Sequence, residues 1–80
     1  MKAAFVLVGT EAGAEREVLA KIRGMRHATE AYTVYGSYDI VVKVEAETAA
    51  EVKEAVERGI RRLEGVRSTL TMLVTEQSAA

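Results

Sequence analysis

The chain of 80 residues contains no cysteine, no proline and no tryptophan. Without cysteine, it can form neither a disulfide nor a thiolate metal site. It has one histidine and no acidic cluster of calcium-loop spacing, so we expect no metal and no cofactor. The first apolar run spans only a few residues, which is too short for a signal peptide or a membrane span. We therefore expect a cytoplasmic protein with no membrane partner.

Asparagine is also absent, and glutamine occurs once. Together with the abundance of Glu and Arg, this composition is typical of heat-adapted proteins. A small protein from a GC-rich genome, with no thermal history, would have the same composition. The residues alone do not distinguish the two origins.

Positive charge is not in excess, because eleven basic residues stand against twelve acidic ones. Arg58, Arg61, Arg62 and Arg67 surround one predicted helix, where neighbouring Glu residues neutralise part of their charge. A dedicated nucleic-acid binder has a clearly positive surface, and the sequence shows no helix-turn-helix. We therefore expect no direct contact with nucleic acid.

About half of the residues are apolar (49%), which predicts a single globular domain over residues 1–80. A domain this small has a narrow margin of stability, because burial of apolar surface roughly balances the entropy lost on folding. Since no disulfide or metal is available, we expect oligomerisation to supply further stability.

Hydrophobic periodicity predicts four strands and two helices in the order βαββαβ. The strands are expected over residues 4–8, 31–35, 38–44 and 68–74. One helix begins at Ala14 and ends near Gly24, and the other opens at the capping box Thr48-Ala49-Ala50-Glu51 and ends before Gly65. The fold class is therefore α+β, a ferredoxin-like four-stranded antiparallel sheet with both helices on one face. Residues 77–80 are expected to form a frayed tail.

The middle strands are predicted to form a hairpin. Residues 36–37, Gly-Ser, suit a two-residue turn of type II′. This turn would pair Val34 with Asp39. Beyond that pair, Tyr35 would face Tyr38 as a cross-strand packing pair.

The sheet face that the helices leave open is expected to be apolar. If Phe5 and Leu7 face the helices, then Ala4, Val6 and Val8 face away from them. Further apolar candidates for this open face are Tyr32, Val34, Val41 and Leu73. An apolar patch of this size indicates an interface. We expect a homodimer packed sheet to sheet, as in dimeric α+β barrels.

One tract offers the groups needed to hold an amino acid. Asp39 is the only acidic residue in an otherwise apolar strand, and the Gly36-Ser37 turn has free backbone amides. Hydroxyl groups come from Ser68, Thr69 and Thr71 on the last strand. The ammonium group would bind the aspartate, and the carboxylate would bind the amides and hydroxyls. The structural alternative is an ordinary turn capped by its aspartate, and residue chemistry alone favours it because such turns are common.

Catalytic arrangements are lacking. His27 is the only histidine, and its place after Arg26 suits a surface position at a helix end. No Cys-His, Ser-His-Asp or HExxH pattern is present, so we predict no catalytic residue and no enzyme activity. A small dimeric α+β-barrel enzyme remains an alternative that an inward-pointing His27 in a polar pocket would support. An ACT-type sensor is weaker, because Gly13 after the first strand is not part of an Asp-x-Pro-Gly motif.

Residues 31–44, AYTVYGSYDIVVKV, resemble the signature of the Lrp/AsnC ligand-binding domain, also called the RAM domain. That signature is a strand, then Gly-x-Tyr/Phe-Asp, then an apolar strand ending in Lys-Val. Residues 15–18 and 65–69, with Thr71, fit its usual flanks, and the resemblance covers about residues 4–74.

The resemblance implies a ferredoxin-like unit that dimerises through its sheet. It also implies a ring of four dimers, an octamer, with an amino acid bound between dimers. The implied ligand-binding residues are Gly36, Ser37, Tyr38, Asp39, Ser68, Thr69 and Thr71.

Full-length members of this family begin with a helix-turn-helix, whereas Met1 lies just before the first predicted strand. We therefore expect a stand-alone form of the domain. Such a form would sense an amino acid, co-assemble with a full-length Lrp/AsnC regulator, or regulate another process.

Overall fold

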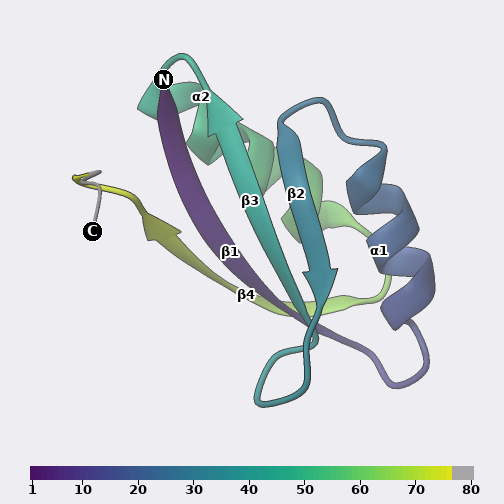
Figure 1. Cartoon of the computed structure of the whole chain (residues 1–80). Coiled ribbons are helices and arrows are strands. Elements are labelled where there is room, and N and C mark those ends of the chain that lie inside the picture. The colour runs from purple at the N-terminus through teal and green to yellow at the C-terminus, as the bar shows by residue number, and fades with distance from the viewer. Residues whose placement is uncertain (77–80) are drawn as a thin grey trace.

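A computed structural model describes residues 1–76 of the chain, which form the predicted βαββαβ unit (Figure 1). Its elements are β1 (Lys2–Thr10), α1 (Glu15–Arg23), β2 (Ala28–Thr33), β3 (Ile40–Ala46), α2 (Ala49–Glu54) and β4 (Val66–Leu73). A π-helical turn, η1 (Ala55–Gly59), and a 3-10 turn, η2 (Ile60–Arg62), continue α2. The tail predicted at residues 77–80 lies outside the described residues.

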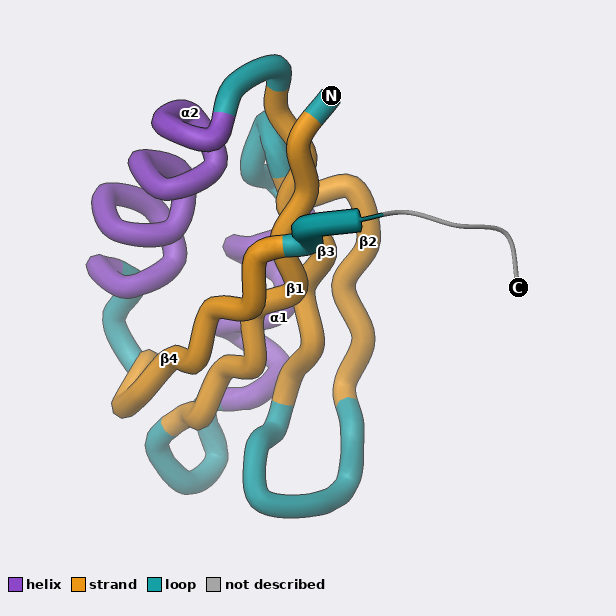
Figure 2. Tube along the Cα trace, turned by 90° about the vertical axis from the view of Figure 1, so that its left-hand side faces the viewer, coloured by secondary structure: helices purple, strands orange, loops and turns teal. Residues whose placement is uncertain are grey.

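The four strands form one antiparallel sheet in the order β2-β3-β1-β4. Figure 2 shows both helices on the same side of this sheet. The ferredoxin-like prediction is therefore confirmed, and β2 and β4 are the edge strands. Within residues 1–76, no helix is long and apolar enough to span a bilayer.

The core lies between the sheet and the helices and consists of aliphatic side chains. Helix α1 contributes Val18 and Ile22, which are four residues apart and so lie on the same helix face. Complete burial of an aliphatic side chain of this size contributes about 1.5–3 kcal/mol. The fully buried larger side chains are Val6, Val8, Val18, Ile22, Ile40, Val42, Val44, Val52 and Ile60.

The two faces of β1 are reversed relative to the prediction, which placed Phe5 and Leu7 toward the helices. Val6 and Val8 are fully buried against the helices, whereas Phe5 is 39% exposed on the open face. Because β1 is apolar on both faces, the alternation of its side chains does not indicate which face is buried. The faces of β4 are reversed in the same way. Leu73, which was expected on the open face, pairs with Ala4 on the helix side. Ile40, Val42 and Val44 of β3 are buried in the core.

The hairpin between β2 and β3 is longer than predicted. Strand β2 ends at Thr33 and β3 begins at Ile40, so residues 34–39 form a loop that projects beyond the sheet (Figures 1 and 2). The predicted register is confirmed, because Val34 N donates to Asp39 O at 2.9 Å. The predictions of a two-residue turn and of a packing pair between Tyr35 and Tyr38 are wrong. Tyr35 is fully exposed because the loop carries it past the last cross-strand pair.

Gly59, at the end of the π-helical turn, has a close neighbour in the loop between α1 and β2. A Cβ at this position would lie 3.1 Å from Met25 Cε. The glycine therefore makes room for the α1–β2 loop. Gly65, with φ +95°, adopts the left-handed conformation that favours glycine, in the turn before β4.

The predicted capping box at the start of α2 is present. Thr48 Oγ1 accepts from Glu51 N at 3.1 Å, and Glu51 Oε1 accepts from Thr48 N at 3.2 Å. Each bond satisfies an amide that the first helical turn leaves without a partner.

We expect Thr48→Ala to lower the free energy of unfolding by about 1 kcal/mol, because the Glu51 amide loses its acceptor. In a domain of this size, that loss lowers the melting temperature by about 4–8 °C. Thr48→Ser keeps the hydroxyl and should unfold close to the parent in a urea titration. Equal destabilisation by Ala and Ser would show that the hydroxyl does not provide the stabilisation.

Candidate functional site

The open face of the sheet has an apolar centre. Phe5 pairs with Met72 across β1 and β4, and Leu7 pairs with Leu70. Phe5, Leu70 and Met72 are 39%, 46% and 46% exposed in the isolated chain. Monomeric proteins rarely leave large apolar side chains contiguous on their surface, so this patch has the character of an interface.

A polar border lies on the β2 side of this apolar patch. Tyr32 OH donates to Glu30 Oε1 at 2.8 Å, and Lys43 Nζ lies 3.8 Å from Glu30 Oε2. The hydrogen bond to Glu30 and the negative charge of that carboxylate raise the pKa of the Tyr32 phenol. The phenol therefore stays protonated, as a hydrogen-bond donor, across the neutral pH range.

Asp39 lies at the end of the open face, where β1 ends and β3 begins. Its Oδ2 accepts from Thr10 N at 2.8 Å and from Thr10 Oγ1 at 3.3 Å. Its backbone N donates to Val8 O at 2.9 Å. Thr10 is only 6% exposed, so these bonds hold the carboxylate in one orientation. The aspartate thus caps the end of β1, not the turn as the structural alternative proposed.

Oδ1 of Asp39 accepts no hydrogen bond within residues 1–76. One oxygen of the carboxylate therefore stabilises the fold, and the other is available to a ligand. This division allows a single residue to have a structural and a binding role.

Ser68 lies on the same sheet face as Asp39, with β1 between their strands. Gly9 pairs with Ser68 on β4 and follows Val8, which pairs with Ile40 at the start of β3. A Cβ at Gly9 would come 2.7 Å from Ser68 Oγ, so the hydroxyl leans over the glycine toward β1. The carboxylate and this hydroxyl therefore lie in one row across the end of the sheet.

The two threonines of the predicted site lie on the opposite face. Thr69 pairs with Val8 and Thr71 with Val6, both of which point into the core. Both threonines line a hollow of about 530 Å³ beside the second helix. Within one chain, they do not join Asp39.

The loop residues of the predicted site differ in exposure. Gly36 and Ser37 are exposed at the loop tip, whereas Tyr38 and Asp39 are half-buried nearer the sheet. The structure thus groups Asp39, Tyr38 and Ser68 at one end of the sheet. A ligand held by the whole predicted set would need a second copy of the chain.

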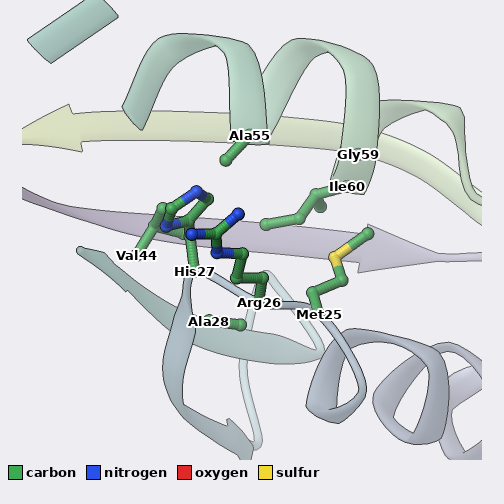
Figure 3. A pocket seen from close by; sticks show the side chains of 8 residues that line it. All are labelled: Met25, Arg26, His27, Ala28, Val44, Ala55, Gly59 and Ile60. Carbon is green, nitrogen blue, oxygen red and sulfur yellow. The ribbon is translucent and has the colours of Figure 1, made fainter. Parts of the chain in front are cut away.

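His27 is not at a helix end, because α1 ends at Arg23. It is half-buried in the α1–β2 loop, with Nδ1 3.2 Å from Glu45 O. It borders a cavity of about 170 Å³ between that loop and the second helix (Figure 3). The surface of this cavity is apolar, and a second, polar hollow beside it also includes His27 in its lining. No pattern in the sequence predicted this cavity, although two of its lining residues, Ala55 and Gly59, are small and lie four residues apart in the second helix.

A family comparison covers nearly the whole chain. The model of the Lrp/AsnC ligand binding domain matches residues 3–79. A solved structure from Thermus thermophilus, TTHA0845, superposes with a TM-score of 0.94 and 31% identity, covering 100% of both chains.

Two curated relatives are much longer than this chain. The HTH-type transcriptional regulator FL11 of Pyrococcus furiosus is 34% identical over 71 residues, which are 89% of this chain and 46% of the regulator. A homocitrate synthase of Sulfolobus acidocaldarius is 43% identical over 56 residues, which are 70% of this chain and 11% of the enzyme. Archaeal relatives of this kind fit the heat-adapted composition.

Proposed function

Because this chain belongs to the Lrp/AsnC ligand-binding domain family, we propose that it binds an amino acid and that binding changes how its copies assemble. The family is regulatory, as the relative FL11 illustrates, and the chain is a regulatory domain. We propose that the 80 residues act as a single domain in the cytoplasm, without catalytic activity and without direct contact with nucleic acid.

Assembly is proposed to begin with a homodimer formed through the open sheet face. The observation that supports this is the pairing of Phe5 with Met72 and of Leu7 with Leu70, whose side chains have no cover in the single chain. Two such faces packed together would remove this apolar surface from water. In a two-fold dimer, every contact of this kind occurs twice.

The amino acid is proposed to bind beside Asp39 at an interface between dimers. Its ammonium group would approach Oδ1, since Oδ2 is engaged by Thr10. Its carboxylate would accept from the backbone amides of residues 36–37 and from Ser68. Thr69 and Thr71 lie on the other face of edge strand β4 and would contact the ligand from a neighbouring dimer.

This arrangement would couple binding to assembly. A ligand contacted by two dimers binds the assembled state more tightly than the separate dimers, and so shifts the equilibrium toward the assembly. A tetramer of dimers, an octamer, is the proposed product. The same interfaces would allow co-assembly with a full-length Lrp/AsnC regulator.

A second candidate partner follows from the homocitrate synthase match. This enzyme contains a segment 43% identical to the present chain. In this second case we propose that the chain responds to an amino acid in the same way, but that it acts on a metabolic enzyme. An effect of the domain on the activity of such an enzyme, but not on a regulator, would favour this candidate.

A screen of the twenty amino acids by thermal unfolding and light scattering tests the proposal. At a ligand concentration of about 100 times Kd, binding to the folded state adds about 2.7 kcal/mol. We therefore expect at least one amino acid to raise the melting temperature by about 10 °C or more, with a rise in mass. The D-enantiomer is the control, because a site that contacts three groups on the α-carbon distinguishes the two. No shift with any amino acid would refute the proposal.

A further inference from the structure

The cavity beside His27 lies on the helix side of the sheet, away from the proposed amino-acid site. Its apolar lining includes Met25, Ala28, Val44 and Ile60. Its volume is about 170 Å³, similar to an engineered apolar cavity of about 150 Å³ that binds benzene. It therefore has room for a branched aliphatic chain or a single ring.

The helix above the cavity is irregular. The π-helical turn Ala55–Gly59 places two small residues over the opening. Gly59 lies where this turn ends and the 3-10 turn begins. A side chain here would meet Met25 Cε, at 3.1 Å from Cβ. Small side chains thus keep the space open, and π-helical turns are often found at functional sites.

A polar mouth adjoins the apolar cavity. A second hollow of about 410 Å³ shares His27, Ala55 and Gly59 with the cavity and adds Glu54 and Arg58. Figure 3 shows the side chains of Arg26 and His27 reaching toward Ala55. The mouth therefore combines charged side chains with direct access to an apolar space, as small-molecule sites do.

Two arginines at this mouth, Arg26 and Arg58, form no ion pair within the described residues. Within residues 1–76, the two ion pairs are Glu17–Lys21 and Glu30–Lys43, so Arg26 and Arg58 are paired with no carboxylate. Glu51, which also borders the mouth, accepts from Thr48 in the capping box. Two guanidinium groups and two carboxylates, those of Glu51 and Glu54, thus border the cavity and its mouth, and neither guanidinium group is held in an ion pair with a described residue.

His27 has a defined orientation at the mouth. Its Nδ1 lies 3.2 Å from Glu45 O, and a carbonyl oxygen only accepts hydrogen bonds. Glu45 N also donates to His27 O at 2.9 Å, which fixes the backbone of this loop to β3. Nδ1 therefore holds the proton, and the ring is held beside the opening.

We propose that this pocket binds a small carboxylic acid with a compact apolar body. The apolar body fills the cavity beneath Ala55 and Gly59. The carboxylate accepts charge-assisted hydrogen bonds from Arg26 and Arg58 at the mouth. This site is separate from the one beside Asp39, so each can exist without the other.

An NMR titration with 4-methylpentanoate tests the proposal, using the methyl signals of Met25, Ala28 and Ala55. We expect saturable shifts of these signals. 4-Methylpentanamide has the same shape without the charge, and we expect it to bind at least about tenfold more weakly, the effect of losing a charge-assisted hydrogen bond.

Three variants separate the parts of the site. Ala55→Leu places an isobutyl group over the cavity and should abolish the shifts, while the spectrum confirms that the chain is folded. Arg58→Gln, at an exposed position, should weaken binding about tenfold. Asp39→Ala should leave binding unchanged, whatever it does to an amino-acid response. Absence of shifts at millimolar 4-methylpentanoate, equal binding of the amide, or unaltered binding by Ala55→Leu would each overturn the proposal.

Discussion

Leu70→Glu is expected to convert the assembled protein into monomers. Leu70 lies opposite Leu7 in the apolar centre of the open sheet face and is 46% exposed in the single chain. The substitution therefore costs the isolated fold little. In a sheet-to-sheet dimer, it removes about 2 kcal/mol of apolar burial per copy and places a carboxylate where no partner is available.

The effect on the dimer is expected to be large because the two-fold axis places the substitution on both sides of the interface. Two copies together should weaken association by at least about 4 kcal/mol, which raises the dimer Kd by about 10³-fold. Analytical ultracentrifugation over a concentration series measures this change. Circular dichroism reports whether the monomer keeps its fold.

Leu73→Glu is the matched control for this prediction. Leu73 lies on the same strand, is 47% exposed and pairs with Ala4 on the helix side. The same chemical change on the other face should leave the dimer intact. A dimer that persists in Leu70→Glu, or dissociates equally in both variants, would exclude the open face as the specific interface.

Asp39→Asn is expected to abolish the amino-acid response and to leave the domain nearly as stable as the parent. The amide oxygen can still accept from Thr10 N, which Asp39 Oδ2 now does at 2.8 Å. The negative charge that would pair with the ligand's ammonium group is lost. Thermal unfolding with and without the amino acid found in the screen measures both quantities.

Asp39→Ala is expected both to abolish the amino-acid response and to destabilise the domain. It leaves the amide of Thr10, a residue only 6% exposed, without its acceptor. An unsatisfied buried donor costs about 1–3 kcal/mol. The comparison of Asn with Ala therefore separates the structural oxygen from the ligand-binding one. An amino-acid response retained by Asp39→Asn would show that the carboxylate does not bind the ligand.

The local elements of the fold were predictable because their signals lie close together in the chain. The capping box needs only Thr48 and Glu51, three residues apart, and the structure contains both of its hydrogen bonds. The alternation of Ile40, Val42 and Val44 also indicates its buried face directly. Helix and strand order followed from such patterns, and with them the ferredoxin-like topology.

The orientation of β1 could not be derived in this way. Residues 4–8 are apolar at every position, so a period of two selects neither face. The structure buries Val6 and Val8 and leaves Phe5 on the open face. Small β-branched side chains allow the helices to pack close to the sheet, while the larger ring lies where nothing in the single chain packs on it.

The sequence by itself determined the element order, the register of the central hairpin and, through residues 31–44, the family. Tertiary structure alone decided what Asp39 contacts, because its partner Thr10 lies 29 residues away. Tertiary structure also formed the cavity beside His27, whose walls come from residues 25–28, Val44, Ala55, Gly59 and Ile60. Periodicity and caps act within one element, whereas these sites depend on distances between elements that only packing sets.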